Sequence, residues 1–209
     1  MALNPMVIPA AIQSAIKKYV AEWNAGGPQD VAFDTAHLRL LLPHRIYRYM
    51  GEHRAGKADL GSVKPAGWRC FARTTQGNLV MLDAFEAEQH TGFRLHVGSM
   101  PERWLRVIRS ARRNKRLAGG PYSMRTMVAP AVHLSCLWFS TSRGKHHFLA
   151  MEGDVAGVAA RWMTRAEWRT TIADSTTRSA ILWKQARTAR RPRRHQGSAP
   201  PFLQESQLR

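Results

Sequence analysis

The stretch from residue 68 to residue 97 constrains the fold most, because it predicts consecutive strands separated by turns. Residues 68–74 and 78–85 are two strand-like segments, and the Gln76-Gly77 pair between them is typical of a hairpin turn. Residues 93–97 then alternate between apolar and polar side chains, which predicts a third strand with one solvated face. The chain is therefore expected to build an antiparallel sheet that helices flank.

Helices are predicted on the N-terminal side of these strands. Residues 9–25 carry apolar side chains at helical spacing, and Pro9 suits the start of such a helix. A second helix is predicted from Asp34, which can cap it, and Pro43 is expected to break or kink it. Its apolar face would comprise Leu38, Leu42, Ile46 and Met50. On this interpretation residues 1–66 form an N-terminal helical part.

A further helix and hairpin complete the central region, residues 67–153. Ser99 and Glu102 have the spacing of a capping box, so a helix is expected to begin there and to reach about Leu117, within 99–118. A second pair of strands is predicted at residues 132–139 and 146–151, around a turn at 142–145.

The C-terminal region is expected to be helical and then irregular. Thr164 and Glu167 form another capping box, which opens a short helix with Trp168 and Ile172 on one side. A last basic helix is predicted within residues 154–191, from residue 175 onward. The polar, proline-rich tail at 192–209 is expected to be disordered when free.

Composition narrows the class of protein. Apolar residues make up 44% of the 209 residues, enough for a core, and no run of them is long enough to span a membrane. No signal peptide is recognisable at the N-terminus, so a cytoplasmic location is expected. Cys70 and Cys136 cannot form a zinc site alone and are interpreted as reduced core residues.

The net charge of +18 is concentrated in two segments. Residues 101–125 carry eight basic residues and one acidic residue, and residues 184–209 carry seven and one, so together they hold 13 of the 18 net charges. Clustered cations repel one another unless an anion neutralises them, and phosphate backbones are the commonest such partner. The basic segments lack the broad apolar face of an interfacial helix, which disfavours a membrane partner.

The helix at 99–118 is the strongest candidate for contact with nucleic acid. Trp104, Ile108 and Ala111 line one side, so the helix can pack on a sheet and present its cations outward. Its candidate RNA-binding residues are Arg103, Arg106, Arg109, Arg112, Arg113, Lys115 and Arg116. A helix enters the major groove of RNA only where a loop, bulge or duplex end opens it, whereas duplex DNA accepts a helix without distortion. Charge alone leaves both ligands open.

The turn between the last two predicted strands gathers hydroxyls, cations and imidazoles. Its candidate RNA-binding residues are Ser142, Arg143, Lys145, His147 and Phe148, the last as a platform for base stacking or, alternatively, as a core residue. The Phe-Ser-Thr-Ser run also occurs in one class of ADP-ribosyltransferases, but the downstream Glu-x-Glu or Gln-x-Glu of that class is missing. No metal site is predicted, because the histidines lack chelating spacing and the carboxylates are scattered.

Residues 99–153 together resemble the CRISPR repeat-RNA endoribonucleases of the type I-F kind and their type IV relatives. The run Ser99-Met100-Pro101-Glu102-Arg103 opens an arginine-rich helix, as a very similar run does in that family. Ser140 and Ser142, Gly144, and the pair His147-Phe148 follow in the family's order. The resemblance implies a ferredoxin- or RRM-like sheet and a protruding arginine-rich helix that docks in the major groove of a repeat hairpin.

The resemblance also implies an activity, namely metal-free cleavage of precursor CRISPR RNA without a cofactor. Such a protein would leave a 2′,3′-cyclic or 3′ phosphate and stay on its product with other subunits of a ribonucleoprotein complex in a prokaryotic cytoplasm. The family's first helix carries a histidine that acts on the attacking ribose hydroxyl, where this chain has Lys17, Lys18 and Tyr19. The candidate catalytic residues are therefore His44, Tyr19 and Ser140. The alternative is a non-catalytic nucleic-acid-binding protein of a mobile element or phage.

Overall fold

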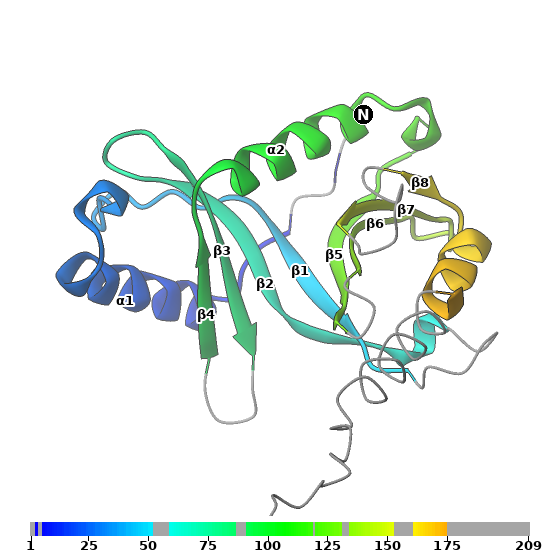
Figure 1. Ribbon diagram of the computed structural model, residues 1–209, viewed down its shortest axis with the longest axis horizontal. Helices are drawn as coiled ribbons and strands as arrows, with labels where there is room; N and C mark the ends of the chain where they lie inside the picture. The colour runs from blue at the N-terminus through cyan, green and yellow to red at the C-terminus, as the bar shows by residue number, and fades with distance from the viewer. Residues whose placement is uncertain are drawn as a thin grey trace, which may run out of the picture.

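One eight-stranded sheet organises the chain, with α1 and α2 packed on opposite faces (Figure 1). The computed structural model describes residues 3, 6–51, 59–86, 91–118, 120–130, 134–152 and 161–174. The strands are β1 (Leu41–Tyr49), β2 (Val63–Arg73), β3 (Leu79–Glu86), β4 (Thr91–His96), β5 (Ser123–Ala129), β6 (Leu134–Ser140), β7 (His146–Glu152) and β8 (Trp162–Met163). Their order in the sheet is β4-β3-β2-β1-β5-β6-β7-β8. The prediction of an α+β chain with a mostly antiparallel sheet is confirmed.

The β1–β5 pair is the parallel one, and it joins two antiparallel halves. Parallel neighbours need a crossover connection, and here it runs through β2, β3, β4 and α2 (Ser99–Arg112). The predicted hairpins are confirmed: β2 and β3 meet at a turn with Gly77 at φ +83°, and β6 and β7 meet at a turn with Gly144 at φ +76°. Positive φ values suit glycine, which lacks a Cβ.

The prediction of a helix from Asp34 to Met50 is wrong. The Asp34 carboxylate does accept hydrogen bonds from the backbone N–H groups of Ala36 and His37, but only a bend at residues 35–37 follows it. The chain then becomes β1, in which side chains alternate between the two faces of the sheet. Pro43 is accommodated by a register shift between Leu41 and His44, so the missing N–H costs no regular ladder bond. The N-terminal part is thus helical only in its first half.

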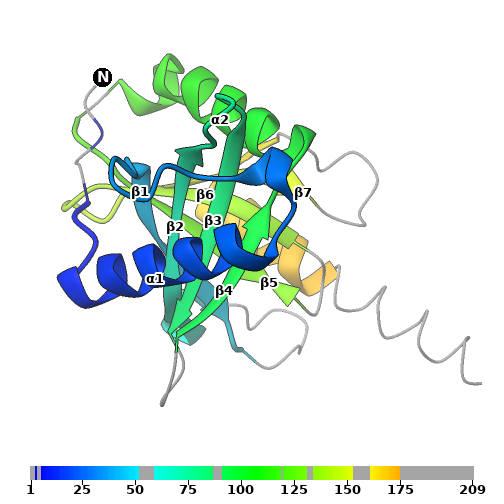
Figure 2. The same ribbon diagram turned by 90° about the vertical axis from the view of Figure 1, so that its left-hand side faces the viewer.

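The first helix is confirmed as α1 (Ala10–Gly26), which follows Pro9. Its buried Ile16 and Val20 pack against alternate residues of β2 and β3, such as Cys70 and Leu82. Figure 2 shows α1 lying across these strands. The intervening residues of the same strands point to the other face, where α2 lies.

The start and end of α2 differ in detail from the prediction. The residue before the helix is Gly98, at φ +76°, and no side chain caps the first turn, so Ser99 and Glu102 do not form the expected capping box. The α-helix ends at Arg112, and a separate 3-10 turn, η3, follows at Lys115–Leu117. The buried Leu117 anchors that turn to the core beneath α2.

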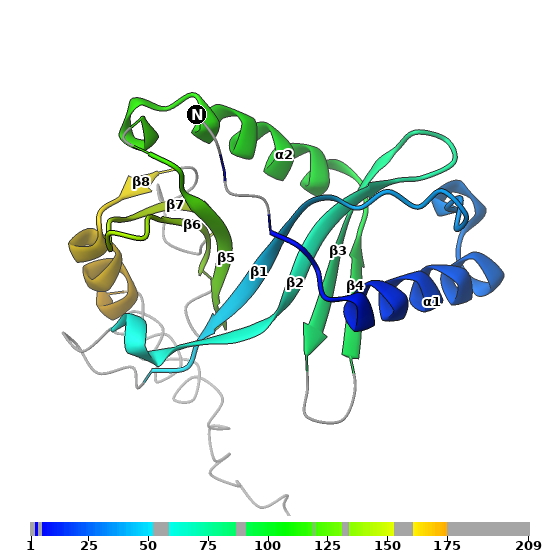
Figure 3. The ribbon, with the colours of Figure 1, turned by 180° about the vertical axis from the view of Figure 1, so that it is seen from behind.

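The second half of the sheet has its own cover. Residues 165–174 are helical, and Trp168 and Ile172 pack against β6 and β7 on the face opposite α2 (Figure 3). The capping box at its start is confirmed, because Thr164 and Glu167 exchange side-chain hydrogen bonds of 2.7 and 3.2 Å. The predictions for residues 175–191 and 192–209 lie outside the described residues. No helix among the described residues is long and apolar enough to cross a membrane.

Candidate nucleic-acid interface

Helix α2 separates its apolar side from its cations, as predicted. Pro101, Trp104, Leu105, Ile108 and Ala111 are buried against the sheet. Full burial of a side chain such as Ile108 stabilises the fold by about 1.5–3 kcal/mol, so this side fixes the helix in place. The cationic side is thereby held toward solvent.

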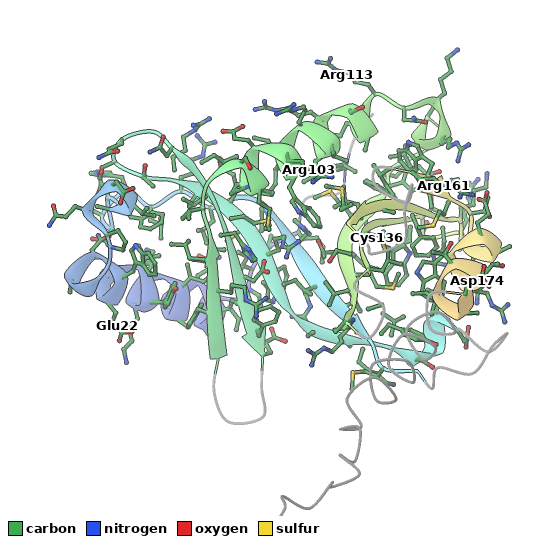
Figure 4. All side chains as sticks on the ribbon, in the orientation of Figure 1. Glu22, Arg103, Arg113, Cys136, Arg161 and Asp174 are labelled. Carbon is green, nitrogen blue, oxygen red and sulfur yellow. The ribbon has the colours of Figure 1, made fainter. Side chains whose placement is uncertain are left out.

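The exposed cations form one surface, called the basic ridge below. It comprises Arg103, Arg106, Arg109, Arg112, Arg113, Lys115 and Arg116 of α2 and the turn after it, with Arg143 and Lys145 of the β6–β7 turn. In Figure 4 the Arg113 side chain points away from the sheet. Within the part of the chain that the structure describes, no carboxylate pairs with any of these nine cations. The ridge therefore offers its positive charge to an external anion.

Tertiary contacts bring the two sequence segments of the ridge together. The ring of Tyr122 lies 5.9 Å from the ring of His147 in an edge-on arrangement, and its hydroxyl donates to the Arg116 carbonyl at 3.5 Å. The pKa of His147 is lowered by burial and then by the charges of Arg116 and Lys145. The β6–β7 turn thus lies beside η3, although about 30 residues separate them in sequence.

The β6–β7 turn presents its polar residues outward on a defined loop. The backbone N–H of Thr141 donates to the Lys145 carbonyl at 3.1 Å, and the Thr141 hydroxyl accepts from the Lys145 N–H at 3.2 Å. Ser142, Arg143 and Lys145 are exposed. Hydroxyl and cationic donors on a closed loop suit contact with phosphate or ribose.

A buried ion pair beneath α2 was missed by the sequence analysis. Arg69 of β2 donates to both carboxylate oxygens of Asp83 on β3, at 2.6 and 2.7 Å, and His96 lies 3.0 Å from the second oxygen. The Arg69 guanidinium carbon also lies 4.3 Å from the Trp104 ring centroid, so the pair contacts α2 directly. A charged residue in each of two adjacent apolar strands is the signal that could have predicted it.

Phe148 does not offer a stacking surface, and this prediction is corrected. Its side chain is fully buried, with its ring stacked between Trp138 at 6.1 Å and Trp168 at 5.2 Å. It lies on the face opposite the basic ridge, because the adjacent His147 faces Tyr122 and the α2 cluster. The alternative interpretation, a core phenylalanine, holds.

Replacing Phe148 by leucine is therefore expected to lower stability and leave nucleic-acid affinity unchanged. The smaller side chain leaves a void between two tryptophans, and the expected loss in the free energy of unfolding is about 1–2 kcal/mol. Urea denaturation measures this loss. Arg143→Ala is the matched control and should show the reverse, unchanged stability with weaker binding. A tenfold loss of affinity in the Phe148 variant with intact fold would contradict this assignment.

His44 is placed where it cannot act on a ligand at the ridge. It is fully buried on β1, its Nδ1 lies 2.7 Å from the Leu42 carbonyl, and its Nε2 lies 2.9 Å from the Thr126 hydroxyl. Since a carbonyl only accepts, Nδ1 carries the proton and the Nε2 lone pair is occupied by the threonine hydroxyl. Burial lowers the pKa of His44 to about 4, so it stays neutral. The prediction of a catalytic base here is wrong.

The buried neutral His44 predicts acid sensitivity. Its pKa is lower in the folded protein than in the unfolded chain, so the unfolded state binds more protons as pH falls from 6.5 to 4. The stability that comes from keeping His44 neutral is fully present above pH 6.5. As pH falls through this window, the free energy of unfolding declines by up to about 3 kcal/mol. The free energy of unfolding, measured in urea at pH 7 and 4.5, should fall less in His44→Gln than in wild type. The exposed His37→Gln is the control and should behave like wild type.

The other two catalytic candidates lie apart from each other and from His44. Tyr19 is on α1, where its ring stacks on Phe93 of β4 at 4.6 Å, and burial raises its pKa. Ser140 ends β6 and is nearly buried. Neighbouring strands are about 4.8 Å apart, so the five steps from β4 to β6 span about 24 Å along the sheet. Because His44 faces α2 and Ser140 faces away, the three residues form no joint site.

The described part of the chain contains no assembled metal site and no reactive thiol. No group of three His, Cys, Asp or Glu side chains among the described residues could hold a metal ion. Cys70 and Cys136 are buried free thiols whose pKa values burial raises, that of Cys70 to about 12. A thiol with a raised pKa is a poor nucleophile, so both act as core residues.

Comparisons with known proteins add no assignment: no family model matches the chain, and neither a curated protein nor a solved structure matches it.

Proposed function

We propose that the chain binds a hairpin of structured RNA through the basic ridge. The observation that carries this proposal is the juxtaposition of α2 and η3 with the β6–β7 turn. It groups on one surface nine cations that no carboxylate of the described residues neutralises. Arginines predominate, and a guanidinium can hold a phosphate or a guanine edge with two parallel hydrogen bonds.

The shape of the ridge favours an RNA stem that ends in a loop or a free end, and it disfavours a long continuous duplex. A helix of 14 residues is about 21 Å long, and the β6–β7 turn stands beside its C-terminal end. A long duplex lying along α2 would have to pass this turn. An RNA stem that ends there would meet the Ser142 hydroxyl and the Lys145 ammonium with its terminal nucleotides, where the groove is open.

The narrower proposal is that the ligand is a CRISPR repeat hairpin, held by this chain as a subunit of an RNA-guided complex. It rests on the order of motifs between Ser99 and Phe148. The ferredoxin- or RRM-like arrangement implied by that resemblance stays a prediction. The observed order of one helix, four strands, one helix, four strands and the helix at 165–174 differs from β-α-β-β-α-β. Binding at the ridge does not require the predicted cleavage chemistry, for which His44 is enclosed and Tyr19 is remote from the ridge.

Cross-linking in cells tests the proposal. The protein is irradiated in its native cell, purified under denaturing conditions, and the attached nucleic acid and peptides are sequenced. We expect RNAs that share one hairpin, joined to peptides covering residues 103–116 and 142–147. Duplex DNA on the same peptides would favour the alternative, a DNA-binding protein. Cross-links confined to other parts of the chain would refute the ridge as the interface.

A further inference from the structure

An unpaired arginine lies on the opposite face of the sheet from the basic ridge. The guanidinium carbon of Arg125 on β5 lies 4.7 Å from the Trp138 ring centroid and 5.4 Å from that of Tyr47. Its Nε is buried without a hydrogen-bond partner, and no carboxylate in the described part of the chain pairs with it. Two aromatic rings thus hold a half-buried cation in place, and its charge is not neutralised from within the described protein.

Side chains that can donate hydrogen bonds lie on the same face of the sheet as this arginine. In cross-strand register Arg125 pairs with Trp138, and the next paired positions, Ser123, Ser140 and His146, lie at the ends of the same three strands. Paired residues project to the same face, and their Cβ atoms are about 4.5–5.5 Å apart. This face is the one opposite α2, because Phe139, between Trp138 and Ser140, packs beneath α2. The cluster holds one cation, two hydroxyls and an imidazole.

One hydrogen bond fixes the tautomer of His146, so that its Nε2 is a hydrogen-bond donor. The Trp138 Nε1–H donates to Nδ1 of His146 at 3.1 Å, so Nδ1 is unprotonated and the ring proton of the neutral imidazole sits on Nε2. Burial lowers the pKa of His146, as do the charges of Arg165 and Arg125. The ring thus presents an N–H group rather than a lone pair.

The same turn connects this cluster to the basic ridge. Ser140 is the last residue of β6 and His146 the first of β7, and the turn between them carries Arg143 and Lys145 of the ridge. A nucleic-acid strand that leaves a stem docked on α2 needs to cross only this end of the sheet to reach Arg125.

We propose that Arg125 and His146, with the hydroxyls of Ser123 and Ser140, form a phosphate-binding site for the single strand that flanks the RNA stem. The proposal rests on the ridge as the site of stem binding. A phosphate offers several oxygens in a compact tetrahedron, which matches a guanidinium, an imidazole N–H and hydroxyls better than a carboxylate would. The phosphate is either an internal phosphodiester or a terminal phosphomonoester, and the two share this chemistry.

The test compares hairpin RNAs with a blunt end and with a three-nucleotide flank on either side. Fluorescence anisotropy measures the dissociation constants for wild type and for Arg125→Met, which keeps an apolar chain between the rings. We expect one flank to tighten binding by wild type about tenfold or more, and Arg125→Met to lose that gain while binding the blunt stem as wild type does. Arg48→Met, on an exposed residue of the other face, is the matched control and should keep the gain.

Chemical variants of the flank identify the phosphate. Methylphosphonate linkages remove the charge of one phosphodiester at a time, and phosphatase treatment removes a terminal phosphate. The gain should depend on one of these groups in wild type and on none in Arg125→Met. If Arg125→Met fails to fold, Arg125→Gln, which also removes the cation, and His146→Asn carry the same comparison.

Failure of the phosphate site and failure of the ridge as the stem-binding surface give different results. If wild type binds blunt and flanked stems equally, or if the arginine and histidine variants keep the gain, the phosphate site is refuted and the ridge stands. If wild type binds no stem at all, the proposed function fails and the flank site fails with it.

Discussion

A variant in which four arginines of the basic ridge become alanine is expected to bind hairpin RNA on the order of 100-fold more weakly. The four, which follow one another along the outward side of α2 and η3, are Arg106, Arg109, Arg113 and Arg116. Each phosphate contact releases counterions, so the slope of log affinity against log salt should become shallower by about 3. Anisotropy titrations at several salt concentrations measure both quantities.

The fold should survive this substitution. All four side chains are exposed, alanine favours the helix, and the change removes repulsion between like charges one turn apart. Thermal melting checks this point.

A control variant removes the same charge elsewhere. It replaces four exposed cations outside the ridge, Lys17, Lys18, Arg39 and Arg48, with alanine. Its affinity should fall far less than that of the ridge variant. Equal losses in both would mean that net charge alone attracts the RNA, and an unaffected ridge variant would place the interface elsewhere.

Single arginine variants separate positioning from recognition. Loss of a phosphate contact weakens binding to every hairpin alike, whereas loss of a base contact weakens binding to one sequence and relaxes specificity there. Arg109 and Arg113, near the middle of the ridge, are the first positions to compare with Arg103 at its start.

Replacing Asp83 by alanine is expected to destabilise the protein by about 3–5 kcal/mol. The substitution leaves the Arg69 guanidinium buried between two strands and α2 without its carboxylate. Burial by itself would raise the pKa of Asp83, but hydrogen bonds from Arg69 and His96 outweigh it and lower the pKa to about 2. The ionised pair therefore persists down to strongly acidic pH. Urea denaturation at pH 7 measures the loss.

A double variant tests whether the loss reflects an orphaned charge. Removing both charges, as in Arg69→Met with Asp83→Leu, should recover most of the stability lost in Asp83→Ala, because no buried charge is left unpaired. The exposed pair of Lys18 and Glu22 provides the comparison, and Glu22→Ala should leave stability nearly unchanged. If Asp83→Ala were as stable as wild type, the ion pair would not be what holds β2, β3 and α2 together.

The Asp83 variant also connects the core to the interface. Arg69 contacts Trp104 on the underside of α2, and His96 ends the strand that leads into this helix. Loss of the pair is thus expected to weaken RNA binding through displacement of α2, although neither residue touches the ridge. Addition of RNA should in turn raise the melting temperature of wild type.

Local sequence signals determined much of this protein. Three kinds of feature depend only on residues close together in sequence. They are helix α1 with Pro9 before it, the two hairpins, and the Thr164–Glu167 capping box. The division of α2 into an apolar and a cationic side follows likewise from helical periodicity. These features were predictable because neighbouring residues alone fix them.

Tertiary structure decided the rest, because the remaining features depend on partners far away in the sequence. The segment 41–49 has apolar residues at helical spacing, yet pairing with β2 and β5 makes it a central strand that encloses His44. Phe148, which the sequence analysis predicted as a stacking platform, is a core residue because two tryptophans flank it, one of them from residues 165–174. The contacts of Tyr122 join η3 to the β6–β7 turn. Periodicity reports which side of an element is apolar, but only the packed chain determines what covers it.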